Sequence, residues 1–220
     1  MDQEAEVKGL AFDEEKHEYA YQGVPIPGCT RIIAGLQDWT GVPVDAMEYK
    51  SQIGREVHRL TAEIDRLGFD VAIGEKTIDP ELIGYLYAWE AFKEDTAFSP
   101  TAIERMVFSK RHLCAGILDR LGCCMQKIHP GEELVVDIKC VSQLGPHVGV
   151  QLAGYSTMVN EKRKKADHVK FRYAVQLQPD GLYRVQPYED PSDQASFLAA
   201  LTIHNWRLQH ERHYRSAEYQ

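Results

Sequence analysis

The sequence predicts one α/β or α+β domain in which a central mixed β-sheet is flanked by helices. Apolar segments of strand length occupy the second half of the chain, and amphipathic helical segments precede, interrupt and follow them. The 220 residues, 44% of them apolar and 26% charged, suffice for one large core. Because no internal repeat or low-complexity linker divides the chain, we expect a single domain over residues 1–220.

The first part of the chain is expected to form a hairpin followed by two helices. Residues 8–35 alternate apolar and polar positions, and Gly23 can close a hairpin turn. The later of the two helices is predicted between Pro80 and Asp95, with Pro80 in its first turn. The first helix is predicted from residue 45 to Gly68 because apolar residues recur every three or four positions, at Ile53, Val57, Leu60, Ile64 and Leu67.

The rest of the predicted core, which spans residues 45–190, contains the sheet. Strands are predicted at 102–109, 115–125 and 134–141, followed by a helix at 148–164. Two more strands, at 169–178 and 182–187, are joined by Asp180-Gly181, which is a hairpin signal. A C-terminal helix is predicted at 192–214.

The charge and hydropathy of the chain limit the classes of function that it can have. No stretch approaches the roughly 18 apolar residues of a membrane span, and the acidic segment Met1–Glu6 lacks the features of a signal peptide. We therefore expect a cytoplasmic protein. The net charge of −8 weighs against a nucleic-acid partner, but Glu161–Lys165 is a basic run and a bound divalent ion would reverse the field of clustered carboxylates. The alternative for this run is a solvated helix end.

Asp137 and Lys139 lie in an otherwise apolar segment that reads as a buried central strand. Strand alternation puts both side chains on one face and Ile138 on the other. Burial of a carboxylate and an ammonium is costly unless they are paired or bind a charged ligand. This pair therefore predicts a functional site.

Glu104, Asp119 and Asp137 fall on three consecutive predicted strands, which commonly neighbour one another. Their carboxylates could converge on Mg²⁺ or Mn²⁺, and Lys139 could orient or deprotonate a water or stabilise phosphate charge. Each residue also has a simpler interpretation. Asp119 could form a structural ion pair, Glu104 could be half-exposed, His58 could be packed or solvated, and Gln151 and Tyr155 could be a helix-surface pair.

Four motifs in order resemble the PD-(D/E)xK nuclease superfamily, in particular RecB-like exonucleases and their phage-encoded relatives. The motifs are Gly54-Arg55-Glu56-Val57-His58 (Gly-x-x-Val-His), Gly116-Ile117-Leu118-Asp119 (Gly-x-x-Asp), Asp137-Ile138-Lys139 (Asp-x-Lys) and Gln151-Leu152-Ala153-Gly154-Tyr155 (Gln-x-x-x-Tyr). Their order and separations fit that branch, and the resemblance extends from the first hairpin to the closing helix. It implies a restriction-endonuclease-like core.

The resemblance also implies a chemistry. It assigns Lys139 as the catalytic lysine, assigns Gln151 and Tyr155 to positioning DNA, and predicts the metal ligands His58, Asp119, Asp137, the Ile138 carbonyl and, with a role that varies in the family, Glu104. We expect an Mg²⁺-dependent exonuclease, with Mn²⁺ able to substitute, and further DNA contacts from Lys162 and Lys165.

The setting follows by analogy with these relatives. Phage-type recombination or DNA degradation and repair is expected, in the cytoplasm of a bacterial host if the protein is phage-encoded. Because no helicase motif is present, a separate single-strand annealing or helicase protein is a possible partner, and a homo-oligomer is possible. The alternative function is a non-catalytic nucleic-acid-binding or assembly module. Loss of Lys139 or Asp119 would have signalled that module, and both are present.

Other candidate sites are weaker. The cysteines form no Cys-x-x-Cys pair and none follows Cys140, so no iron–sulfur cluster is expected and buried thiols are favoured. A solvated helix end is favoured over a metal site for His204, His210, Glu211 and His213. Core packing is favoured over base stacking for Trp39, Trp89 and Trp206.

Overall fold

The computed structural model describes residues 7–37, 43–74 and 78–217, with side chains described up to residue 210. The expectations for Trp39 and for the side chains of Glu211 and His213 lie outside the described residues. No described helix combines the length and apolar character needed to cross a membrane.

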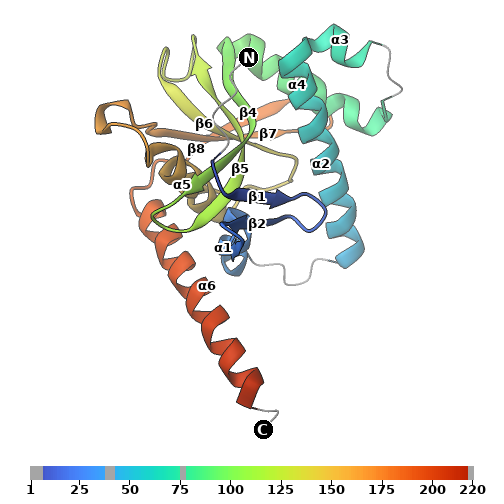
Figure 1. Ribbon diagram of the computed structural model, residues 1–220. Helices are drawn as coiled ribbons and strands as arrows, with labels where there is room; N and C mark the ends of the chain where they lie inside the picture. The colour runs from blue at the N-terminus through green and yellow to red at the C-terminus, as the bar shows by residue number, and fades with distance from the viewer. Residues whose placement is uncertain (1–6, 38–42, 75–77, 218–220) are drawn as a thin grey trace.

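A five-stranded mixed sheet forms the centre of the molecule, with the strand order β4-β5-β6-β7-β8 (Figure 1). Only β6 and β7 pair in parallel, and α5 (His147–Asn160) connects them; the other pairs are antiparallel. The strands are β4 (Phe98–Ser109), β5 (Cys114–Cys124), β6 (Glu133–Lys139), β7 (Phe171–Leu177) and β8 (Tyr183–Pro187). The predicted mixed α/β architecture is confirmed.

Helices cover both faces of this sheet (Figure 1). One face packs against α2 (Val44–Leu67) and α4 (Pro80–Thr96), and the other against α1 (Cys29–Ile33), α5 and α6 (Ser192–Ala217). The alternation of β6 explains how it serves two cores, because Leu134, Val136 and Ile138 enter the first core while Val135 enters the second. Strand alternation thus leaves Asp137 and Lys139 on the α5 side.

A small second sheet lies beside β4 and β5. Its strands are β1 (Leu10–Asp13), β2 (Glu18–Tyr21) and β3 (Val24–Ile26), and Gly23 at φ +79° closes the β2–β3 hairpin as predicted. Tyr19 and Ile26 pack on Phe108 and Ala115 of the large sheet. The remaining short helices are α3 (Phe69–Ile73) and the 3₁₀ turns η1 (Ala34–Leu36) and η2 (Lys165–Asp167).

The predicted helix ends have local causes. Gly68, at φ +85°, terminates α2 and donates its backbone N–H to Ile64 O at 2.8 Å. Asp79 caps α4 by accepting the N–H of Glu81 at 3.0 Å, with Pro80 in the first turn.

Helix α5 is shorter than predicted, since it ends at Asn160 instead of 164. The Asn160 side chain pairs with both backbone groups of Val169, at 2.9 and 2.8 Å, and so closes a loop over residues 161–168. Lys162, which falls within the predicted helix at 148–164, therefore lies beyond the end of α5, and Lys165 begins the 3₁₀ turn η2.

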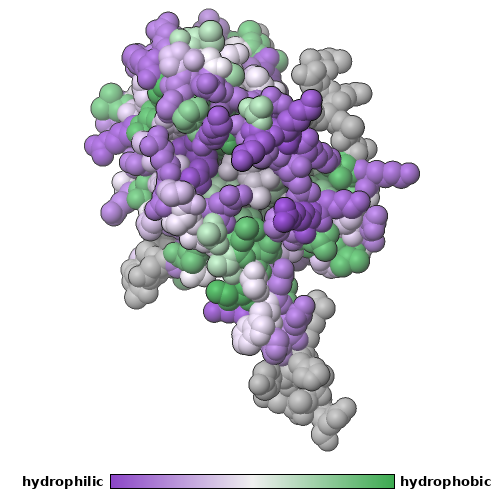
Figure 2. Space-filling model, turned by 90° about the vertical axis from the view of Figure 1, so that its left-hand side faces the viewer, coloured by the Kyte–Doolittle hydropathy of each residue, from purple (hydrophilic) through white to green (hydrophobic). Residues whose placement is uncertain are grey.

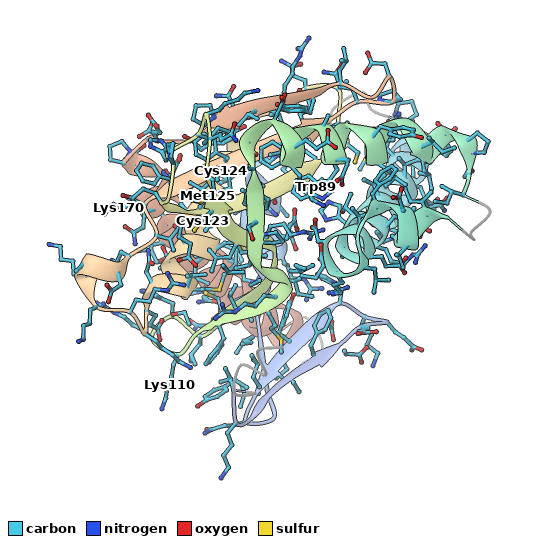
Figure 3. The ribbon with its side chains drawn as sticks, turned by 90° about the horizontal axis from the view of Figure 1, so that it is seen from above. Trp89, Lys110, Cys123, Cys124, Met125 and Lys170 are labelled. Atoms are coloured by element: carbon cyan, nitrogen blue, oxygen red, sulfur yellow. The ribbon has the colours of Figure 1, made fainter. Side chains whose placement is uncertain are left out.

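The core-packing prediction is confirmed for one of the two described tryptophans and wrong for the other. Trp89 is fully buried and lies in the interior of the molecule, as expected of a core residue (Figure 3). Trp206 is 57% exposed on α6 and stacks on His210 with ring centroids 4.4 Å apart, so core packing is the wrong prediction for it. The difference arises because this part of α6 extends beyond the sheet (Figure 1).

Candidate active site

A pocket of about 490 Å³ opens where α2, β4, β5, β6 and α5 meet. The predicted site residues that it brings together are up to 97 positions apart in the sequence, from His58 to Tyr155. Seven residues that the sequence predicted for the site line this pocket: His58, Glu104, Asp119, Asp137, Lys139, Gln151 and Tyr155. Ile138 is adjacent in β6, whereas Lys162 and Lys165 do not line this pocket.

His58, Glu104 and Asp119 form the closest cluster, with ligand atoms that all lie within 4.8 Å of one another. His58 Nδ1 is 3.5 Å from Asp119 Oδ1 and 3.7 Å from Glu104 Oε1. No other group of three such residues occurs in the part of the chain that the structure describes. One imidazole nitrogen and two carboxylates are a donor set that Mg²⁺ or Mn²⁺ can accept.

The backbone of Ile138 organises this cluster. Its N–H donates to Asp119 Oδ2 at 2.6 Å, and its carbonyl lies 3.1 Å from His58 Nε2. When Nε2 carries a proton and donates it to this carbonyl, Nδ1 is left facing the carboxylates. Metal-binding histidines commonly have this arrangement, in which the outer nitrogen donates to a backbone carbonyl.

Asp137 and Lys139 form a buried ion pair beside the cluster, with Lys139 Nζ 2.7 Å from Asp137 Oδ2. Asp137 is only 1% exposed, and neither of its oxygens has a hydrogen bond of good geometry. Lys139 Nζ also donates to Gln151 Oε1 at 3.2 Å, and Gln151 Nε2 donates to the Tyr155 hydroxyl at 3.1 Å. Gln151 and Tyr155 are therefore buried members of one polar chain, and the helix-surface interpretation is wrong for them.

The ionisation of these groups follows from their burial and their neighbours. Burial opposes ionisation of Asp137 more strongly than Lys139 favours it, and this raises the pKa of Asp137 to about 6. Burial disfavours a charged His58, but the Asp119 and Glu104 carboxylates outweigh it and raise the pKa of His58 to about 10. Burial also opposes ionisation of Asp119, yet His58, Lys139 and the Ile138 N–H lower its pKa.

Lys139 remains an ammonium ion in this environment. Burial acts to lower its pKa, but Asp137 and Asp119 outweigh that effect and raise it above the ordinary value. A lysine with a raised pKa is a poor base. The geometry therefore favours stabilisation of negative charge over deprotonation of water.

Behind the cluster lies a buried ion pair between Arg120 and Asp65, which the sequence prediction missed. Arg120 is fully buried; its Nε is 2.5 Å from Asp65 Oδ2 and one terminal nitrogen is 2.8 Å from Glu104 Oε1. Trp89 Nε1 donates to the other oxygen of Asp65 at 3.0 Å. Asp65 follows His58 by seven positions on α2, and this helical repeat was the available signal. Arg120 pairs with Glu104 and Asp65, so the ion-pair alternative applies to Glu104 more than to Asp119.

The backbone of β4 is distorted at Glu104, which has φ +47°. The neighbouring pairs Ile103↔Arg120 and Arg105↔Leu118 are present, but Glu104 and Asp119 form no ladder pair. A left-handed glutamate inside a strand is strained, and such strain is often found at functional sites. The irregularity coincides with the acidic cluster.

Gly116 and Gly54 serve different purposes. A Cβ on Gly116 would lie 2.8 Å from Tyr155 Cε1 and 3.1 Å from Cys29 Cβ, so only glycine leaves room for this ring. A Cβ on Gly54 would meet nothing within 4 Å, and Gly54 lines the pocket one helical turn before His58. Gly54 thus keeps open the approach to the cluster.

The pocket wall includes further residues that sequence reasoning missed. His17 and Tyr19 reach it from the small sheet, Thr30 from α1, and Arg55 and Arg59 from α2. Arg55 and Arg59 flank His58 by three and one positions, but a basic residue on an exposed helix is too common to be a signal.

The mixed sheet flanked by helices, with Asp119 on β5 and Asp137 on the neighbouring β6, agrees with the predicted architecture. The chain has a restriction-endonuclease-like core. No family model matches the sequence, and no curated protein matches it.

Among solved structures, the chain is similar to an alkaline exonuclease, LHK-Exo, from Laribacter hongkongensis. The identity is 13% and the TM-score 0.48, over 87% of this chain and 92% of that chain. A structure of LHK-Exo in complex with dAMP has 14% identity and a TM-score of 0.48, over 89% and 95% of the two chains. Likeness at this level is one of fold only, and residue roles in this chain depend on its own geometry.

Proposed function

We propose that the protein is a divalent-metal-dependent DNA nuclease that acts as an exonuclease on phosphodiester bonds. The observation that carries this proposal is the convergence of the His58–Glu104–Asp119 cluster with the Asp137–Lys139 pair in one open pocket. A purely structural ion network has no need of a pocket, of a distorted strand at Glu104, or of a buried carboxylate with unsatisfied oxygens.

The residues fit a hard divalent cation. Asp119, Asp137, Glu104 and His58 Nδ1 would hold it, and the Ile138 carbonyl would be a further ligand. Asp137 supports this fit, because its buried oxygens lack a well-formed hydrogen bond and have only the Lys139 ammonium beside them, so that a metal cation would further offset their burial. When bound, the cation supplies the Lewis acidity for in-line attack of water on a phosphodiester.

The protein groups then perform three tasks. The Lys139 ammonium neutralises charge that develops on the phosphate oxygens, and Gln151 and Tyr155 hold that ammonium in place. Arg120 fixes the Glu104 carboxylate from behind. The predicted roles of Gln151 and Tyr155 in positioning DNA, and of Lys162 and Lys165 in binding it, are part of the same proposal, as is a setting in recombination or DNA degradation.

Digestion of end-labelled linear DNA and closed circular DNA tests the proposal. Mg²⁺ or Mn²⁺ should permit degradation of the linear substrate, EDTA should abolish it, and the closed circle should survive. Asp119→Asn, which keeps the shape of the side chain, should be inactive under all conditions. Cutting of the closed circle would contradict exonuclease action. If neither metal supports cleavage although the protein binds DNA, the alternative of a non-catalytic binding module is correct.

A further inference from the structure

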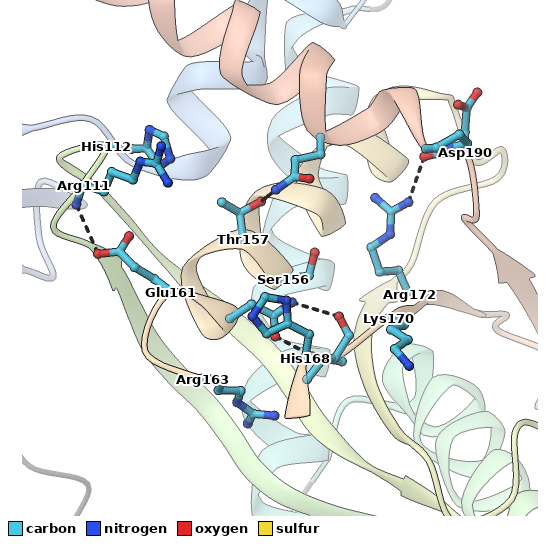
Figure 4. Close-up of a pocket in the computed structure, with 14 residues that line it drawn as sticks. Arg111, His112, Ser156, Thr157, Glu161, Arg163, His168, Lys170, Arg172 and Asp190 are labelled. Carbon is cyan, nitrogen blue, oxygen red and sulfur yellow. Dashed lines mark hydrogen bonds between the residues drawn. The ribbon is translucent and has the colours of Figure 1, made fainter. Parts of the chain in front are cut away.

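A second cavity, of about 620 Å³, is shown in Figure 4. It lies on the other side of α5 from the candidate active site. Gln151 and Tyr155 of α5 face the first pocket, whereas Ser156, Thr157 and Asn160 line the second. The charged and titratable side chains of the second cavity are Arg111, His112, Glu161, Arg163, His168, Lys170, Arg172 and Asp190. None of them belongs to the site described above.

The walls of this cavity are held by hydrogen bonds. Glu161 accepts the backbone N–H groups of Lys110 and Arg111, at 2.9 and 3.1 Å, and the hydroxyl of Ser109. These contacts fix the β4–β5 turn, residues 110–113, to the end of α5. On the other side, the Asn160–Val169 pairing fixes the loop over residues 161–168. The cavity is therefore a built feature of the fold.

The two carboxylates of the cavity, Glu161 and Asp190, already accept hydrogen bonds from the protein. Glu161 holds the β4–β5 turn, and Asp190 accepts the N–H and the hydroxyl of Ser192 at 2.8 and 2.7 Å. Two of the cations are also compensated from outside the cavity: Arg163 pairs with Glu133, and Arg172 lies 3.2 Å from Asp193.

Arg111 and Lys170 remain, and both are exposed. Within the described residues, neither side chain has an acidic partner. The adjoining segment 161–170 carries five basic and two acidic residues in a protein of net charge −8. Figure 2 views the molecule from this side and shows a largely hydrophilic face.

We propose that this cavity binds phosphate through Arg111 and Lys170, which lie on opposite sides of it (Figure 4): either separate phosphates of a nucleic-acid backbone, or the phosphate of a free nucleotide at one of the two cations. The chemistry follows from two uncompensated cations at a polar cavity, to which a polyanion is the complementary ligand. The nucleic-acid source rests on the proposed function.

Metal-free DNA binding, measured by fluorescence anisotropy in EDTA over a range of salt concentrations, tests this inference without cleavage. Arg111→Gln with Lys170→Gln should weaken binding several-fold and reduce the salt slope by roughly 0.7–0.9 for each lost phosphate contact. The matched control is Lys110→Gln with Lys164→Gln, which removes the same charge from the same segments but from side chains that do not line the cavity. Lys110 and Lys170 lie on one side of the molecule in Figure 3.

The control pair should leave the salt slope unchanged. Equal losses in the two double variants would overturn the inference, because net charge alone would then explain the binding. Calorimetric titration with inorganic phosphate and deoxyadenosine monophosphate distinguishes the sources: binding of either, lost only in the Arg111/Lys170 variant while DNA affinity is kept, assigns the cavity to a free nucleotide.

The two proposals fail separately. If the wild type does not cleave DNA but the cavity variant alone binds DNA more weakly, the proposed nuclease activity is wrong and the phosphate site stands. If the wild type cleaves DNA and the cavity variant matches the control in both binding assays, the nuclease stands and the phosphate site is wrong.

Discussion

Asp137 is buried unfavourably in the candidate site. Its carboxylate is nearly inaccessible, lacks well-formed hydrogen bonds, and has a pKa raised to about 6. Because the unfolded chain releases this proton at lower pH than the native state does, native stability falls as the pH rises from about 4 to about 6. Above that window the metal-free protein bears the full cost of the buried charge.

Asp137→Asn should therefore stabilise the metal-free protein at pH 7.5, by about 1–3 kcal/mol on the usual scale of 1.36 kcal/mol per pKa unit. The gain should shrink toward pH 4, where native Asp137 is protonated and the unfolded carboxyl also begins to take up its proton. Chemical denaturation in EDTA at the two pH values measures it. In the wild type, added Mn²⁺ should raise stability, and in the variant it should not; equal stabilisation of both by Mn²⁺ would remove Asp137 from the ligand set.

Lys139→Ala should slow DNA cleavage at least ~100-fold, because the ammonium is held where phosphate charge develops. Mn²⁺ binding, followed by calorimetry, should persist. Tyr183→Phe, which removes a distant hydroxyl bound to Asp95, is a control for non-specific effects on rate. Near-normal turnover of Lys139→Ala would end the catalytic assignment, and global unfolding of this variant would make Lys139 a structural partner of Asp137.

Metal binding should release a proton from His58, whose pKa is raised to about 10 in the metal-free protein. At neutral pH the ring is protonated, so a cation must displace that proton to reach Nδ1. The apparent affinity for Mn²⁺ should rise by up to tenfold per pH unit between pH 6 and 8. Calorimetry in two buffers with different ionisation enthalpies counts the released proton. If the affinity of His58→Gln for Mn²⁺ depends on pH in the same way, another group releases the proton.

At the scale of the elements, two glycines in α2 and β5 have opposite surroundings. Gly116 sits where a side chain would strike Tyr155 and Cys29, whereas Gly54 faces open space in the pocket. The same substitution at each position therefore separates packing from access.

Gly116→Ala should displace Tyr155 and lower the melting temperature. The new Cβ is fixed to the backbone and the Tyr155 ring is rigid, so the overlap between them can be relieved only by moving the ring out of its packed position. Gly54→Ala should instead stabilise α2 by up to about 1 kcal/mol, because alanine is the better helix former. Its DNA cleavage should nevertheless fall if the substrate approaches over this turn. Thermal melts and single-turnover cleavage check both variants, and full activity of Gly54→Ala would show that the substrate enters elsewhere.

At the scale of the whole molecule, α6 has two parts. Phe197 and Leu201 are buried against α5, and a Cβ on Gly154 would lie 2.5 Å from the Phe197 ring. Beyond this contact the helix leaves the body (Figure 1), and the side chains of Ile203, Trp206 and Leu208 are exposed. The first part belongs to the core, whereas the described second part does not.

Truncation after Asn205 should leave the fold and the DNA cleavage intact, with a change in stability of about 0.5 kcal/mol or less, as for a surface change. Phe197→Ala should cost about 3–5 kcal/mol by opening the second core. Circular dichroism melts compare the two. A large loss on truncation, accompanied by a change in molar mass in solution, would instead identify the exposed part of α6 as a contact between copies of the chain.

The strands and helices were predictable because their signals are local. The three- and four-residue spacing of Ile53, Val57 and Leu60 specifies α2, and a polar pair in an apolar strand points to a site at Asp137 and Lys139. The C-terminal boundary of α5 was not predictable from the sequence. The helix ends at Asn160, whose side chain pairs with the backbone of Val169 across a loop.

Sequence by itself determined the residue types of the candidate site, their order, and the kind of element, strand or helix, on which each lies. Tertiary structure alone decided that Arg120 holds Glu104 and Asp65, that Ile138 links Asp119 to His58, and that α5 separates two polar cavities. The physical reason is that burial and long-range hydrogen bonding depend on which strands become neighbours. Such contacts join residues 16 to 80 positions apart, and no local pattern records them.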